Sequence, residues 1–452
     1  MSPVTPHHST LALHDVLGHL LAEWTEGVAR ELRAAKPPEE GAEPEPFRVV
    51  YVDAFANSGG RHVLVGPGRS AARGSASRGV RALDRLAARA PGARVRLHAT
   101  AVLVEADPAE LDRLERELER TGAGHRVRRT DDPSGVAPGE VALLHMEWAD
   151  AAERVARYAA AADHALCFLA PPAPGKLPLA SLRPLLAAPR ADVLVSFPHA
   201  DLQKQARYRG STIADLPAHA RQLVEGYSAL FGDARYEWLS LWRDAERGGG
   251  SRAAEALLVE RYAERLAAAG DRVVRRVPVH LSGEAADSLY LFLATRDPLQ
   301  VLALNQALRA AGVDDRAQLD RAFRSDVPDE AEDAGTLELF GIGDAEPPPT
   351  APGALPADLA LLSRTLRERF RGRTATYGEV VGGLADTDLT PDEVRRAMAV
   401  LKRTGEAVYR SLSDADAEVA FPESPVPPAR PKRARRALDM PLLGGLEPES
   451  EE

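Results

Sequence analysis

Two acids at the ends of neighbouring predicted strands are the residues best placed to do chemistry. Asp53 lies near the end of the strand predicted at residues 47–56, and a turn rich in small residues follows as far as Gly59. Glu105 ends the second predicted strand, residues 95–105. Small side chains let a ligand approach the backbone closely, and ligands bind outside the carboxyl ends of strands in parallel sheets. A carboxylate at the second tip is suited to accept hydrogen bonds from ribose hydroxyls, so the layout predicts a pocket for a nucleoside cofactor.

The turn differs from the two best-known nucleotide-binding motifs. It lacks the G-x-G-x-x-G fingerprint of dinucleotide sites and the G-K-[ST] run of phosphate-binding loops. The alternative interpretation is an ordinary strand-to-helix turn that carries a surface acid.

Three further groups of residues are candidates for chemistry. His199 and Asp201 follow the apolar strand predicted at residues 192–197, and we take them as the candidate general acid/base residues. A metal ion in a nuclease would need acids and histidines such as His145, Glu147, Asp150 and Asp163. Their spacing fits no metal motif, so we interpret them as solvated helix residues and predict no metal site. Cys167, the only cysteine, lies in an apolar strand and is expected to be a buried structural thiol.

The elements that must position these residues alternate between strand and helix. Strands are expected at residues 47–56, 95–105, 127–129, 141–145, 164–169 and 192–197, and helices at 74–89, 108–121, 149–161 and 179–186. This alternation predicts an α/β protein with a Rossmann-like, mostly parallel sheet and helices on both faces. After helical stretches at 216–231 and 251–269, the strand-like runs 273–281 and 289–295 are expected to pair as an antiparallel edge of the same sheet.

Composition divides the chain into five segments. An N-terminal helix and loop, residues 1–46, precede the Rossmann-like domain, residues 47–325. Residues 326–356 are acidic and then Pro-rich, which predicts a linker. Residues 357–422 are expected to form a small domain, and residues 423–452 a disordered tail that is rich in Pro, Arg and Glu.

The small C-terminal domain has the pattern of three helices followed by a hairpin. Helices are predicted at residues 359–370 and 377–384, and a third begins after Thr390 with a proline and two acids in its first turn. Residues 406–411 and 417–421 alternate as a hairpin does. Three helices and a wing predict a winged helix-turn-helix, whose third helix enters a major groove of DNA.

Positive charge gathers in this region although the whole chain has a net charge of −10. Residues 359–410 hold ten Lys/Arg against seven Asp/Glu. The candidate nucleic-acid contacts are Arg395, Arg396, Lys402 and Arg403 near the third helix, and Arg430, Lys432, Arg433, Arg435 and Arg436 in the tail. Such clusters bind phosphates without regard to sequence, so we expect nucleic acid, in the first place DNA, as a partner. The alternative is a protein-binding or structural winged helix with a solvated tail.

Composition also excludes several classes of protein. The chain is 44% hydrophobic and 27% charged, as soluble globular proteins are. No stretch approaches the roughly 18–20 uncharged apolar residues of a membrane span, and residues 1–10 lack the pattern of a secretory signal. One cysteine excludes disulfide frameworks and iron–sulfur clusters built by this chain alone. We expect a cytoplasmic protein, associated with the nucleoid if it binds DNA, with no membrane contact.

Several short motifs, in order along the chain, resemble those of the three-Cys-motif partner proteins (TcmP). Residues 51–56 resemble the family's Y-I-D-x-F-A-G-P-G, residues 74–76 its G-S-P, and residues 105–107 its I-E-x-D. Residues 167–175 stand where the family has F-x-D-P-F-G, and residues 195–197 resemble its V-N-F. With the terminal winged helix at 366–408, the resemblance covers residues 7–410.

This resemblance implies a fold similar to class I S-adenosylmethionine-dependent methyltransferases. It also implies a function in nucleic-acid modification or repair and a cysteine-rich, radical-type partner protein. Glu105 would hold the ribose of S-adenosylmethionine. The residues implied around the methionine end of this cofactor are Asp53, Ala54, Phe55, Ala56 and Gly59.

Two departures from the family pattern leave the enzyme assignment open. The family's A-G-P-G has become residues 56–59, Ala-Asn-Ser-Gly, and the acid of D-P-F-G is replaced by Ala170. Amino-group methyltransferases carry [DNS]-P-P-[YFW] here, where the polar residue accepts hydrogen bonds from the target amine and the ring stacks on a flipped base. Residues 170–173, Ala-Pro-Pro-Ala, lack both groups. We therefore expect a methyltransferase-type protein with a degenerate catalytic motif; a catalytically silent DNA-binding accessory protein and a metal-dependent nuclease are the alternatives.

A short motif in the linker points to a further partner. Residues 336–340, Thr-Leu-Glu-Leu-Phe, resemble a Q-x-S-L-F run of the family and the motif by which bacterial proteins dock on the replication sliding clamp. Leu337 and Phe340 would make that contact. Packing of the Leu-Phe pair on the sheet is the alternative.

Overall fold

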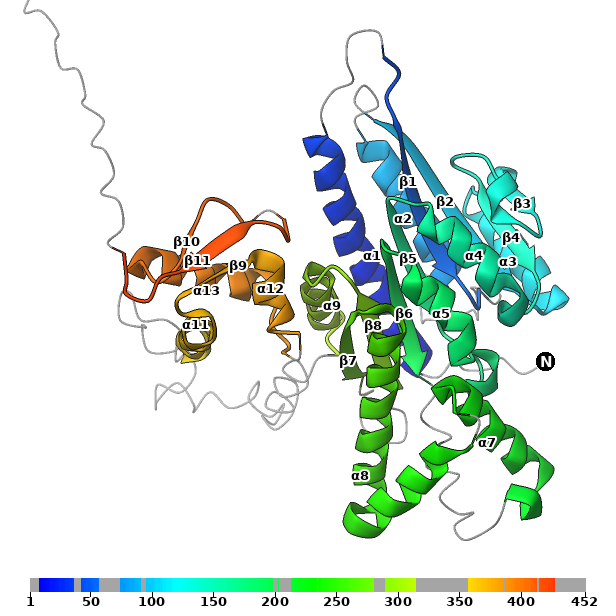
Figure 1. The fold of residues 1–452 in the computed structure, drawn as a ribbon. Coiled ribbons are helices and arrows are strands. Elements are labelled where there is room, and N and C mark those ends of the chain that lie inside the picture. The colour runs from blue at the N-terminus through cyan, green and yellow to red at the C-terminus, as the bar shows by residue number, and fades with distance from the viewer. Residues whose placement is uncertain are drawn as a thin grey trace, which may run out of the picture.

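The chain folds around one large sheet and a smaller C-terminal unit (Figure 1). The computed structural model describes residues 8–35, 42–56, 74–90, 95–197, 202, 213–233, 235–279, 289–313, 357–385, 387–412 and 414–426.

The large sheet has eight strands, and six of them are parallel. The strands are β1 Pro46–Asp53, β2 Arg96–Glu105, β3 Val127–Arg129, β4 Val141–His145, β5 His164–Leu169, β6 Ala191–Phe197, β7 Val273–Val279 and β8 Leu289–Thr295. Their order is β3-β4-β2-β1-β5-β6-β8-β7, and β8 runs antiparallel to both β6 and β7. The predicted Rossmann-like, mostly parallel sheet with an antiparallel edge is therefore confirmed.

Helices cover both faces of this sheet and define two apolar cores. The helices are α1 His8–Ala34, α2 Ser75–Arg89, α3 Pro108–Arg120, α4 Trp148–Ala160, α5 Leu179–Ala187, α7 Ala218–Phe231, α8 Glu237–Gly270 and α9 Leu299–Ala310. Short 3-10 turns lie at Gly124–Arg126, Pro133–Gly135, Pro174–Lys176 and Ile213–Asp215. Because the central strands are buried on both faces, they read as continuous apolar runs in the sequence.

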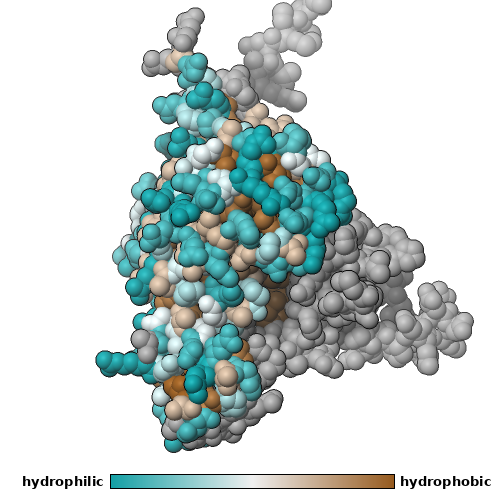
Figure 2. Space-filling model, turned by 90° about the vertical axis from the view of Figure 1, so that its right-hand side faces the viewer, coloured by the Kyte–Doolittle hydropathy of each residue, from teal (hydrophilic) through white to brown (hydrophobic). Residues whose placement is uncertain are grey.

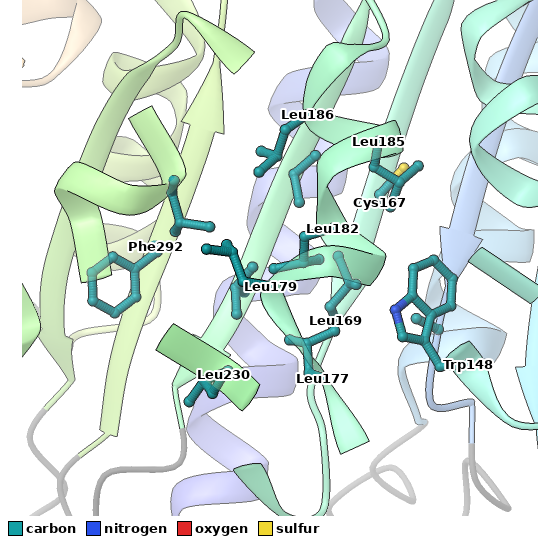
Figure 3. Close-up of a cluster of buried hydrophobic side chains, with 14 of the residues drawn as sticks. Trp148, Cys167, Leu169, Leu177, Leu179, Leu182, Leu185, Leu186, Leu230 and Phe292 are labelled. Atoms are coloured by element: carbon teal, nitrogen blue, oxygen red, sulfur yellow. The ribbon is translucent and has the colours of Figure 1, made fainter. Parts of the chain in front are cut away.

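One core lies between the sheet and helices α4, α5, α7 and α8. Figure 3 shows part of it, where leucines of α5 face Cys167 and Leu169 of β5 and Phe292 of β8. The other core packs α1, α2, α3 and α9 on the opposite face. Outside these cores the helices are mostly polar, and in Figure 2 hydrophilic side chains predominate over the upper part of the coloured surface, with apolar ones between them.

A glycine allows α2 to approach the first strand. A Cβ at Gly79 would collide with the ring of Tyr51, which is completely buried. The long helix α8 is bent rather than straight, because Gly250 has non-helical backbone angles (φ 77°, ψ 179°).

The C-terminal unit has three helices and a small antiparallel sheet. Its elements are α11 Ala357–Phe370, β9 Arg373–Thr376, α12 Tyr377–Gly382, α13 Pro391–Thr404, β10 Val408–Tyr409 and β11 Glu418–Phe421. The sheet order is β10-β11-β9. Capping boxes begin α12, with Thr376 and Glu379, and α13, with Thr390 and Glu393, so the start predicted for the third helix is confirmed.

Strand β9, helix α9 and the first part of α8, residues 237–250, were not predicted from the sequence. Strand β9 has only four residues and directly precedes α12, so it offers too short a pattern to detect. Helix α9 is apolar on several sides because it packs on α1 as well as on the C-terminal unit, which leaves no clear polar face. Among the described residues, no helix is both long and apolar enough to cross a lipid bilayer.

Candidate functional site

The predicted acids meet at the carboxyl edge of the parallel strands. Asp53 is the last residue of β1 and pairs in register with Leu103 of β2 and Phe168 of β5. Glu105 ends β2 two residues further along, beside His145 at the end of β4. The structure thus brings the two predicted cofactor acids to adjacent strand tips, as the topology of a parallel sheet requires.

The backbone after Asp53 continues to bond to the neighbouring strands. The N–H of Ala54 donates to the carbonyl oxygen of Phe168 (3.0 Å), and that of Ala56 donates to Val104 on the other side (2.9 Å). Both alanine side chains are buried. The half-buried ring of Phe55 lies 6.4 Å from that of Trp148, measured between ring centres. The chain is therefore held between β2 and β5 up to the start of the small-residue turn.

Asp53 has the most unusual environment of the predicted site residues. Its side chain is 0% exposed. Oδ1 accepts a hydrogen bond from the N–H of Phe55 (3.3 Å), while Oδ2 has no partner among the described residues. Burial raises the pKa of Asp53 to about 7, although interactions with Ser75 and the Phe55 amide oppose the rise. A buried carboxyl whose second oxygen has no partner in the described part of the chain is suited to a cationic or hydrogen-bond-donating ligand.

Glu105 is less buried and is positioned by its own turn. Its Oε1 accepts a hydrogen bond from the N–H of Asp107 (2.7 Å), and Asp107 in turn caps α3. Partial burial raises the pKa of Glu105, while the amides of Asp107 and Ala106 oppose the rise. A carboxylate fixed at this strand tip can accept hydrogen bonds from a diol such as a ribose.

The end of β5 supplies no polar side chain for catalysis. Residues 170–173 are Ala-Pro-Pro-Ala, and Ala170 packs partly against the apolar core. A contact beyond this loop joins it to the segment between β4 and α4, since Nζ of Lys176 donates to Oε1 of Glu147 (2.7 Å). Both side chains are about half exposed, at 49% and 48%, so this ion pair adds little stability.

Trp148 is a residue of this edge that sequence analysis missed. It begins α4 directly after the β4 tip, it is 2% exposed, and its Nε1 donates to Oγ of Ser181 (3.0 Å). Its ring lies beside that of Phe55, tilted by 50°. In the sequence, the available signal was a tryptophan three residues after the end of a predicted strand. Only the fold shows that this tryptophan contacts Phe55.

Several predicted residues lie outside the described parts of the chain. They are Gly59 of the small-residue turn, the acid/base candidates His199 and Asp201, the linker residues Leu337 and Phe340, and the tail residues Arg430, Lys432, Arg433, Arg435 and Arg436.

The acids and histidine considered for a metal site are dispersed. His145 Nε2 lies 3.2 Å from the carbonyl oxygen of Ala106, and Asp163 accepts a hydrogen bond from the N–H of Arg48 (2.8 Å). Asp150 is exposed in the first turn of α4. Within the described ranges no group of three or more His, Cys, Asp or Glu side chains could hold a metal ion.

Cys167 is the buried thiol that the sequence predicts. It is 0% exposed in the middle of β5, and burial raises its pKa to about 12. Because the thiolate is the reactive form, we expect no labelling of the folded protein by a thiol-specific disulfide reagent at pH 8. One thiol per chain should react at once in guanidinium chloride. Rapid labelling without denaturant would show that β5 is accessible and would contradict this burial.

The basic residues predicted on the third helix of the C-terminal unit all face solvent. Arg395, Arg396, Lys402 and Arg403 are exposed, opposite a buried face that includes Val394 and Leu401. Arg395 pairs with Asp392 (2.8 Å), and Nζ of Lys402 lies 4.3 Å from the centre of the Tyr409 ring.

Comparison with known proteins yields distant likenesses only. No protein-family model matches the sequence, and no curated protein matches it. Among solved structures, the chain is similar to Legionella pneumophila protein LPL1258 of family DUF519 (9% identity, TM-score 0.30, covering 62% of this chain and 84% of that one). It is also similar to the methyltransferase domain of bacterial CtHen1 (11% identity, TM-score 0.25, 61% and 99%) and to PKMT2 of Rickettsia typhi in complex with AdoHcy (9%, 0.22, 65% and 54%). At TM-scores below 0.5 these likenesses do not identify a function.

Proposed function

We propose that this chain binds S-adenosylmethionine at the carboxyl edge of β1 and β2 and is a methyltransferase-type protein of nucleic-acid modification or repair. The observation that carries the proposal is the buried Asp53 carboxyl, with Oδ2 unpartnered among the described residues, one strand away from Glu105. The resemblance to three-Cys-motif partner proteins, with a cysteine-rich partner, belongs to the same proposal.

The chemistry of the two acids suits the two ends of this cofactor. The methionine end carries a cationic ammonium group and a sulfonium, and a cation beside Asp53 offsets the cost of ionising a buried carboxyl. The other end carries a ribose diol, which Glu105 can hold through its carboxylate.

Bound in this way, the cofactor supplies an electrophilic methyl group. The chain must then position an acceptor and take up its proton, and the tip of β5 provides no polar side chain for that task. His199 and Asp201, which follow β6, remain the proposed acid/base residues.

The organisation of the C-terminal unit supports the nucleic-acid part of the proposal. The element order α11-β9-α12-α13-β10-β11 is compatible with the proposed winged helix, and the exposed side of α13 is basic. The basic tail residues would add non-specific phosphate contacts.

A second candidate is a catalytically silent, DNA-binding accessory protein. Residues 170–173 lack both the polar side chain and the aromatic ring that amino-group methyltransferases carry at this point, and this favours the second candidate. Cofactor binding without methyl transfer to DNA, RNA or protein would distinguish it from the enzyme.

The first test is calorimetric titration with S-adenosylmethionine. We expect micromolar binding by the wild type and a loss of about 10- to 100-fold in Glu105→Gln, since hydrogen bonds to a charged group contribute about 1.5–3 kcal/mol. Asp150→Asn is the matched control, because this acid is exposed in the first turn of α4, whereas the Asp53 side chain is buried at the tip of β1. Absence of heat at millimolar ligand would refute the proposed cofactor.

A further inference from the structure

Helix α9 of the large domain holds the loop that leads into α13 (Figure 1). Asn305 is only 3% exposed, and its Nδ2 donates to the carbonyl oxygens of Thr387 (2.9 Å) and Leu389 (2.8 Å). Its Oδ1 accepts a hydrogen bond from Nε of Arg275 on β7 (3.2 Å). One buried side chain thus connects the edge strand, α9 and the loop before α13.

The first turn of α13 is held in the same interface. Nη1 of Arg309 donates to Oε1 of Glu393 (2.9 Å), and Nη2 donates to the carbonyl oxygen of Asp388 (3.3 Å). Glu393 is also the capping-box acid, since its Oε2 accepts from the N–H of Thr390 (2.8 Å). Leu302 of α9 completes the apolar core of the C-terminal unit. The amino-terminal end of α13 is therefore a contact between domains.

The remainder of α13 is open and basic. Arg396, Lys402 and Arg403 are exposed, and none of them forms an ion pair within the described parts of the chain. Arg395 differs from them, because its charge is paired with Asp392 at the amino-terminal end. Stacking on Tyr409 holds Lys402 beside β10.

We propose that nucleic acid binds this unit along the exposed side of α13 beyond its first turn, through phosphate contacts from Arg396, Lys402 and Arg403, and that the helix reads no bases. The inference rests on the nucleic-acid part of the proposed function. A helix-turn-helix reads base edges with the amino-terminal residues of its recognition helix. In this protein those residues are held by α9, and the two acids among them, Asp392 and Glu393, are paired with Arg395 and Arg309. Contacts to phosphates fix position but carry no sequence information.

The test uses the full-length chain and fluorescence anisotropy with two 20-base-pair duplexes of unrelated sequence. The wild type should bind both with affinities within about twofold of each other. Arg396→Gln, Lys402→Gln and Arg403→Gln should each weaken binding to both duplexes equally, by about three- to tenfold, and lower the salt slope by about one. Arg395→Gln also removes one positive charge, but near the amino-terminal end of α13 that contacts α9. It should change the affinity for either duplex less than twofold. Circular dichroism would verify that each variant is folded.

Amide hydrogen exchange measures independently whether the contact between α9 and the amino-terminal end of α13 stays closed when nucleic acid binds. Residues 387–393 should exchange equally fast with and without duplex, while residues 396–410 become protected. Faster exchange at 387–393 on binding would show that the interface opens and would overturn the proposal. A more than tenfold preference for one duplex would also overturn the proposal. So would a loss of duplex affinity in Arg395→Gln as large as that in Arg403→Gln. Failure to bind either duplex at low salt would refute nucleic-acid binding altogether, while the cofactor titration would be unaffected.

Discussion

Asp53→Asn is expected to weaken S-adenosylmethionine binding by about 10- to 100-fold near neutral pH, the range for loss of a hydrogen bond to a charged group. The same change should remove most of the pH dependence of binding. In the unliganded protein burial raises the pKa of Asp53 to about 7, so the carboxyl is largely protonated and neutral below that pH. A cationic ligand favours the ionised form, and a protonated Asp53 must lose its proton before it can pair with the ligand.

The expected direction follows from this linkage. Wild-type affinity should rise as pH increases from about 5.5 to 7.5, by up to about tenfold per unit below the pKa, and then level off. This range stays below the ordinary pKa of an α-amino group, so the ligand remains cationic. Titration calorimetry across the range, with Asp150→Asn as the charge-matched control, measures the slope. An equal slope in Asp53→Asn would show that another group governs binding.

The second large effect concerns the stability of the sheet domain. Arg272 follows α8 and is only 7% exposed. Its guanidinium donates to backbone carbonyl oxygens of three elements, at the end of α5, the start of β6 and in β8. The acceptors are Leu185, Leu186, Ala188, Ala191 and Ala294. A cation at the carboxyl-terminal end of α5 also matches the negative end of the helix dipole.

Arg272→Met should therefore lower the free energy of unfolding by about 3–5 kcal/mol, because several buried carbonyl groups lose their donor at once. Urea unfolding followed by circular dichroism measures this loss. Arg296→Met is the matched control, since Arg296 is exposed and donates to the single carbonyl oxygen of Gly270. It should change stability by about 0.5 kcal/mol or less. If Arg272→Met lowered the free energy of unfolding no more than Arg296→Met does, the carbonyl groups would have found other hydrogen-bond donors.

Much of the secondary structure was predictable because its signals are local. The continuous apolar run ending in Asp53 marks a strand buried on both faces, and alternation with helical patterns indicates a parallel sheet. The start of α13 was predictable from Thr390 and the residues directly after it, because a capping box involves neighbours three positions apart. The positions of Asp53 and Glu105 at adjacent strand tips followed from the same argument, since parallel strands end at one edge.

The sequence by itself therefore determined the α/β class, the buried Cys167 and the edge where the two proposed cofactor acids lie. Only the tertiary structure decided that Asp53 is fully buried and that Arg272 joins three elements through their carbonyl groups. It alone decided that Asn305 and Arg309 hold the amino-terminal end of α13, across more than 80 residues of chain. Periodicity and capping depend on neighbours along the chain, whereas burial, pKa and domain contacts depend on residues that only folding brings together.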